Sequence, residues 1–147
     1  MGKVDFLKCS ADIYNKLIAW RRDFHRNPEL GFEEFLTSAK IKAFLEEEGI
    51  PYIETAKTGI CAIIKGGDVE EGPCKTIALR ADMDALPLED KKVCEYSSQV
   101  KGKMHACGHD AHMTILMGAA KILNSIKSTL KGNVKLLFEP AEETLGG

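Results

Sequence analysis

The sequence predicts an α/β fold in which a layered sheet is flanked by helices. Two observations favour this fold class: segments with helical spacing of apolar residues alternate with short apolar runs, and no internal repeat or low-complexity segment is present. Helices that alternate with strands favour a mixed or parallel sheet over a helical bundle or an all-β sandwich. The 147 residues are also enough to bury a core.

Two helices are expected before the first strand. The first is amphipathic and ends at the Asn27-Pro28 break, because apolar side chains recur at i, i+4, i+7 and i+11, namely Ile13, Leu17, Trp20 and Phe24. The second should run from about Glu33 to Glu48. Gly49 is its natural end, since a residue without a Cβ adopts the left-handed conformation at little cost.

Short apolar runs bounded by turn residues predict four strands, at residues 52–55, 60–64, 76–80 and 134–138. Turns are expected at Glu-Glu-Gly-Pro 70–73 and at 131–133, and Pro140 should end the last strand or place it at an edge. Residues 84–102 read mostly as loop. The following helix, to about residue 126, is apolar over so wide an arc that we expect it to be largely buried.

Charge and cysteine content exclude several classes of protein. The 20 basic and 22 acidic residues give a net charge of −2 without a basic block, so no nucleic-acid partner is expected. No apolar stretch is long enough to span a bilayer, so no membrane association is expected. The five cysteines are an odd set without CxxC spacing, which indicates reduced thiols in the cytoplasm.

Residues suited to chemistry gather in three segments. Two of the segments follow predicted strands and one opens the buried helix: residues 80–84, residues 105–112 and residues 139–143. In open α/β sheets, ligands bind where strands end and the neighbouring helices begin. We therefore expect all three segments to line one site.

The middle segment predicts a metal site. Cys107 and His109 offer a thiolate and an imidazole, which are good ligands for zinc or a related divalent ion, and the shortage of further cysteines favours an open, catalytic type of site. The alternative is that Asp110 caps the helix, His105 and His112 are solvated, and Cys107 is a small core residue.

The acids of the other two segments complete this interpretation. In extended backbone, Glu142 and Glu143 would point in opposite directions, so that one could bind a metal while the other faces a bound water, as metal-assisted hydrolysis requires. A carboxylate such as Asp82 or Asp84 could fix the tautomer of a metal-bound histidine. The alternatives are an exposed glutamate pair and two aspartates that merely form a turn.

Four motifs in register resemble the amidohydrolase branch of the co-catalytic metallopeptidases: RRDFHRNPELGFEE, ALRADMDALPLED, KMHACGHDAHM and LLFEPAEETLGG. The branch includes N-acyl-L-amino-acid amidohydrolases, hippurate hydrolases and indoleacetyl-amino-acid hydrolases. The resemblance implies hydrolysis of the amide bond of N-acyl amino acids or short peptides by a metal-activated water. It implies the following roles in this chain: metal ligands Cys107, His109 and Glu143, general base Glu142, and orienting acid Asp84.

The same resemblance implies two divalent ions per complete site, zinc or manganese, with cobalt or nickel as further choices. It also implies a homodimer and a two-domain protein. Residues 1–147 would be the N-terminal portion of a zinc-peptidase-like metallohydrolase catalytic domain, without the dimerisation and lid domain and the C-terminal part of the catalytic domain. One alternative is a truncated, non-catalytic fragment that binds a metal ion or a complementing chain, and another is a purely structural zinc domain.

Overall fold

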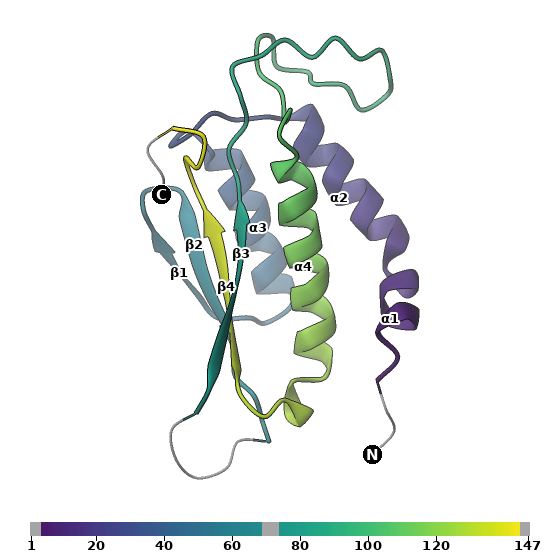
Figure 1. Ribbon diagram of the computed structural model, residues 1–147, viewed down its shortest axis with the longest axis vertical. Helices are drawn as coiled ribbons and strands as arrows, with labels where there is room; N and C mark the ends of the chain where they lie inside the picture. The colour runs from purple at the N-terminus through teal and green to yellow at the C-terminus, as the bar shows by residue number, and fades with distance from the viewer. Residues whose placement is uncertain (1–3, 69–73, 145–147) are drawn as a thin grey trace.

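The computed structural model describes residues 4–68 and 74–144, and it confirms the α/β prediction (Figure 1). The turn expected at 70–73 lies outside the described residues. A mixed four-stranded sheet is accompanied by four α-helices and one short 3-10 helix in the described part of the chain. In chain order these are α1 (Phe6–Asp12), α2 (Tyr14–Arg26), α3 (Phe35–Glu47), β1 (Tyr52–Thr55), β2 (Gly59–Ile64), β3 (Thr76–Asp82), α4 (His109–Ser125), η1 (Lys127–Thr129) and β4 (Asn133–Glu139).

The strand order is β1-β2-β4-β3, with β2 antiparallel to both neighbours and β3 parallel to β4. The register pairs Asp82 with Glu139, so the carboxyl ends of β3 and β4 lie side by side. Because α4 connects these two parallel strands, it runs back along the sheet and begins at that same end (Figure 1). The topology therefore brings all three predicted segments to one end of the molecule.

The core lies between the sheet and the helices. Alternate residues of β2 and β4 face it, as expected for strands with one buried face, and they meet the apolar side of α3 and α4. Fully buried members include Ile41, Leu45, Ile60, Met113, Met117 and Leu136. Helix α4 is largely buried, as expected, although Ile115 is 66% exposed.

Element boundaries differ from the predictions most clearly at two of the helices. Helix α1 was not expected; it begins where the Asp5 carboxylate accepts a hydrogen bond from the Lys8 N–H (3.0 Å), and it is separated from α2 at Ile13. Helix α3 begins two residues later than predicted, and it ends before Gly49, whose φ of 64° confirms the expected left-handed stop. None of the described helices has the length and apolar character needed to cross a membrane.

Candidate metal centre

His109 lies at the centre of the site, as the first residue of α4, and only 2% of its surface is exposed. Its Nδ1 is 2.8 Å from the backbone carbonyl oxygen of Asp84. A carbonyl oxygen can only accept, so Nδ1 carries the hydrogen and donates it. The lone pair of the other ring nitrogen, Nε2, is therefore free to bind a cation.

Cys107 and Glu143 converge on this free nitrogen. The ligand atoms of Cys107, His109 and Glu143 all lie within 4.8 Å of one another, and Glu143 Oε1 is 3.7 Å from His109 Nε2. Glu143 Oε1 is buried and has no hydrogen-bond partner among the described residues. A buried acceptor without a donor is costly, and a thiol, an imidazole and a carboxylate are suitable zinc-type ligands. The donor set therefore fits a divalent metal ion.

The pKa values around this group reflect its excess of negative charge. Burial lowers the pKa of His109, but the Asp84 hydrogen bond and the Asp82 carboxylate outweigh it and raise that pKa overall. The pKa of the Cys107 thiol is raised, mainly through its interaction with the Glu143 carboxylate. Both shifts indicate a site that attracts positive charge, which a bound cation would supply in place of protons.

Asp84, the last residue of the first segment, contacts both of the other segments. Its Oδ1 accepts the Glu142 N–H (3.1 Å) and its Oδ2 accepts the Glu143 N–H (2.9 Å), while Oδ1 also lies 3.3 Å from His109 Nδ1. Burial raises the pKa of Asp84, but these hydrogen bonds dominate and lower it overall. The ionised carboxylate thus orients the histidine and the glutamate turn at the same time.

Glu142 and Glu143 do not point in opposite directions, contrary to the sequence-based expectation. Carboxylate oxygens of both residues lie near the same atom, His109 Nε2, at 3.8 Å and 3.7 Å. The expectation assumed extended backbone, whereas Ala141 has a φ of 55° and the chain turns immediately after Pro140. The two side chains differ in exposure instead, at 38% for Glu142 and 22% for Glu143.

A second group of ligand-type side chains shares His109. Asp82, His109 and His112 also have ligand atoms within 4.8 Å of one another. Here His112 Nδ1 is hydrogen-bonded to Asp82 Oδ1 at 2.7 Å, and Arg80 donates to the other oxygen of Asp82 at 3.2 Å. Arg80 also pairs with Glu139, and this interaction raises the pKa of the guanidinium.

The alternative interpretation of the middle segment is wrong at two residues and incomplete at a third. His105 is buried at 4% exposure, whereas that interpretation placed it in solvent. Cys107 is exposed, so it is no core residue. Asp110 does accept the Ala111 N–H in the first turn of α4 through Oδ1 (2.9 Å), but it is buried at 1% exposure and its Oδ2 lies 2.8 Å from His25 Nδ1 on α2, so it does more than cap the helix.

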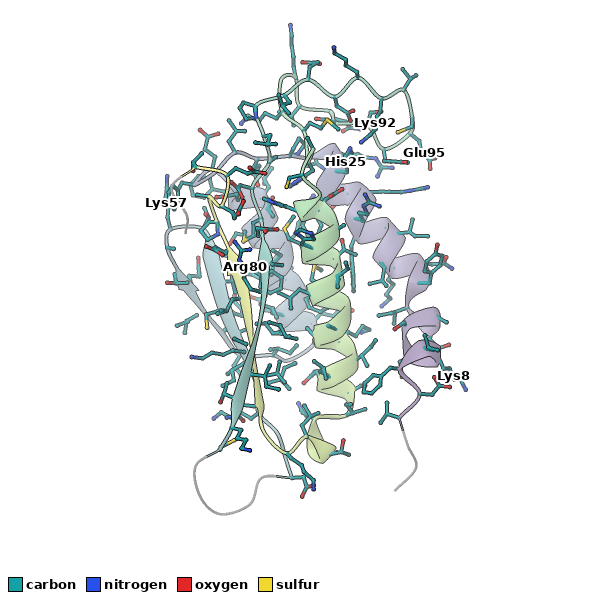
Figure 2. All side chains as sticks on the ribbon, viewed as in Figure 1. Lys8, His25, Lys57, Arg80, Lys92 and Glu95 are labelled. Atoms are coloured by element: carbon teal, nitrogen blue, oxygen red, sulfur yellow. The ribbon has the colours of Figure 1, made fainter. Side chains whose placement is uncertain are left out.

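His25 lies next to the site, although the sequence analysis did not single it out as functional. It belongs to neither ligand group of the described residues. Its other ring nitrogen lies near Asp90 (3.4 Å) and Lys92 (3.5 Å) of the loop between β3 and α4. Figure 2 shows His25 on α2 beside Lys92, near the amino end of α4. The only signal for it in the sequence was its place within the first motif.

Comparison with known proteins extends these observations. The sequence model that describes Peptidase family M20/M25/M40 matches residues 78–147 of this chain. The chain is 46% identical to N-acetylcysteine deacetylase of Bacillus subtilis, covering 91% of this chain and 35% of that protein. It is 48% identical to IAA-amino acid hydrolase ILR1-like 2 of Arabidopsis thaliana, covering 98% and 32% respectively. The chain thus spans about a third of the length of these relatives.

A solved structure agrees with the sequence matches. The YXEP protein of Bacillus subtilis, described as a dinuclear metal binding peptidase from the M20 family, superimposes with a TM-score of 0.83 at 44% identity. The match covers 90% of this chain and 37% of that one. The chain is therefore related to Peptidase family M20/M25/M40, and its resemblance to the amidohydrolase branch of the co-catalytic metallopeptidases is confirmed.

Proposed function

We propose that the protein carrying this chain hydrolyses the amide bond of N-acyl amino acids with the help of divalent metal ions. The observation that carries the proposal is the convergence of Cys107, His109 and Glu143 within 4.8 Å, with Glu142 directly beside them. N-acetylcysteine and IAA-amino acids, named as substrates of two relatives, support this substrate class.

Cys107, His109 and Glu143 would hold a metal ion through Sγ, Nε2 and Oε1. A divalent ion bound there would polarise the amide carbonyl and lower the pKa of a water molecule. Asp84 keeps His109 in the tautomer that presents Nε2, which is the orienting role expected of a carboxylate behind a ligand.

Glu142 is the proposed general base. Its carboxylate is half-exposed, so it can face a substrate and solvent, and its Oε2 lies 3.8 Å from His109 Nε2, next to the proposed ligands. In hydrolysis, Glu142 would accept a proton from the attacking water and deliver it to the departing amine nitrogen. General base catalysis of this kind contributes about 10²- to 10⁴-fold to a rate.

Several finer assignments belong to the same proposal. The complete site would take two ions, zinc or manganese, with ligands beyond this chain. Residues 1–147 would be the N-terminal portion of the catalytic domain, and the whole protein would act as a homodimer in the cytoplasm. The five cysteines, which are all free thiols, are consistent with a reducing compartment.

The adjacent glutamates offer a matched pair of variants. With zinc or manganese present and N-acetyl amino acids as substrates, Glu142→Gln should keep its metal yet lose about 10²-fold or more in kcat, because only the base is removed. Glu143→Gln should lose metal as well, which elemental mass spectrometry would measure. Normal turnover by Glu142→Gln would contradict the proposed role. A wild-type protein that binds metal without turnover would instead support the alternative of a non-catalytic metal-binding fragment.

A further inference from the structure

The first motif, RRDFHRNPELGFEE, contributes no side chain to either ligand group of the described residues. Its last part links α2 to α3 and lies against the residues that follow β3. Leu30 forms a parallel bridge with Ala85, and the Ala85 N–H donates to the Glu29 carbonyl oxygen at 2.8 Å. The segment is therefore attached to the chain directly after Asp84.

Glu34, the last residue of this motif, reaches the glutamate turn. We propose that Glu34 is a positioning residue that fixes the turn carrying Glu142 and Glu143, an inference that rests on the function proposed for that turn. Glu34 is completely buried; its Oε1 accepts the Ala141 N–H at 2.8 Å, and its Oε2 accepts the Thr58 hydroxyl at 2.6 Å.

Glu34 is not used to cap the helix that it precedes. It is the N-cap residue of α3, but its side chain makes no capping hydrogen bond. The Glu29 carboxylate caps α3 instead, by accepting the backbone N–H groups of Leu36 (3.1 Å) and Thr37 (2.8 Å). The whole carboxylate of Glu34 is thus available to hold Ala141 and Thr58.

Three consecutive backbone N–H groups of the turn donate to two buried carboxylates. Ala141 donates to Glu34, and Glu142 and Glu143 donate to Asp84. Ala141 has a φ of 55°, a left-handed conformation that is unfavourable for a residue with a Cβ. Such a conformation persists only when its surroundings impose it, and Glu34 is the group bound to its N–H.

Close packing supports the turn from the same segment. A Cβ on Gly31 would lie 3.0 Å from the Cα and Cβ of Ala141 and 3.1 Å from Thr144 Oγ1. The backbone at Gly31 therefore contacts Ala141 directly, and an added methyl group would displace the turn. Glu34 and Gly31 act on Ala141 through different contacts, so they can be tested independently.

The test measures the affinity of the purified protein for Co²⁺ by absorption titration, together with folding by circular dichroism and thermal unfolding. Glu34→Ala should weaken Co²⁺ binding about 10- to 100-fold, the usual effect of removing a group that orients a ligand. Glu34→Gln should restore binding, because its amide oxygen can still accept the Ala141 N–H while the Thr58 hydroxyl changes from donor to acceptor.

Thr58→Val is the matched control. It breaks the other hydrogen bond of the same buried carboxylate and should lower stability, but it leaves the Ala141 contact intact and should bind Co²⁺ like the wild type. A purely structural role for Glu34 predicts equal Co²⁺ affinities in Glu34→Ala and Thr58→Val once both are folded. That result would overturn the inference.

If Glu34→Ala does not fold, Gly31→Ala replaces it in the Co²⁺ titration. It should weaken Co²⁺ binding by displacing Ala141, and a wild-type affinity in this variant would overturn the inference. Absence of Co²⁺ binding by the wild-type protein would refute the proposed function and the inference together. Tight binding by both the wild type and a folded Glu34→Ala would refute the inference alone.

Discussion

Two groups of ligand-type side chains share His109, and they differ in whether their buried polar atoms already have hydrogen-bond partners. In the second group, His112 and Asp82 are hydrogen-bonded to each other at 2.7 Å. In the first, Glu143 Oε1 is buried without a partner among the described residues, beside Cys107. An unsatisfied buried acceptor costs about 1–3 kcal/mol unless a cation or donor offsets it. The contrast shows that ligand-type side chains lying close together do not by themselves indicate a metal site. A group that also contains a buried acceptor without a hydrogen-bond partner does indicate one.

The largest expected effect concerns Asp84, the carboxylate behind the first group. Asp84→Ala should lower the free energy of unfolding by about 4 kcal/mol, because the N–H groups of Glu142 and Glu143 lose their acceptor and His109 loses a charged neighbour. Urea denaturation of the metal-free protein would measure this change. Asp84→Asn, which keeps one acceptor oxygen, should lose clearly less. A free energy within about 1 kcal/mol of the wild type for Asp84→Ala would contradict the role of this carboxylate.

His105 sharpens the comparison, because both of its ring nitrogens are also buried without partners, yet it belongs to neither ligand group. Burial lowers the pKa of His105 from 6.5 to about 4. Below about pH 6.5 the unfolded chain therefore binds a proton that the folded chain excludes, so stability is lost as the pH falls from 6.5 towards 4.

This lowering of the His105 pKa corresponds to a loss of about 3 kcal/mol in the free energy of unfolding by the acid end of the window. Urea denaturation at several pH values across this window, without metal, should show a weaker dependence on pH in His105→Leu than in the wild type. Identical pH dependences in the two proteins would contradict a buried neutral histidine at this position.

The smallest expected effect concerns the second group. His112→Ala should lower the free energy of unfolding by only about 1 kcal/mol, because the side chain is half-exposed and Asp82 keeps its bond to Arg80. The same urea measurement would detect the change. A loss as large as that of Asp84→Ala would remove the distinction between the two groups.

The arrangement of the site could be predicted from the sequence where it depends on topology. Strand, helix and strand in succession imply that Asp84, His109 and Glu143 meet at one end of a parallel strand pair, and the structure brings them together there. The supporting contacts could not be predicted in this way. Asp110 meets His25 across 85 positions, and Ala141 meets Glu34 across 107, and no local pattern encodes such pairings.

Local backbone conformation was the second feature that could not be predicted from the sequence. The expectation for Glu142 and Glu143 followed from strand periodicity, but the left-handed Ala141 breaks that periodicity one residue earlier. Alanine gives no sign of this conformation, which is imposed by tertiary contacts with Gly31 and Glu34. Helix α1 was missed for a related reason: it has no buried residue, so its sequence carries no strong apolar spacing.

Metal content, determined by elemental mass spectrometry after equilibration with zinc and with manganese, tests the central claim most directly. The wild type, Cys107→Ala and His112→Ala should be compared after removal of unbound ions. We predict that the wild type and His112→Ala retain stoichiometric metal and that Cys107→Ala loses it. Retention by Cys107→Ala together with loss by His112→Ala, or no metal in any of the three, would contradict the assignment of Cys107, His109 and Glu143 as the metal centre.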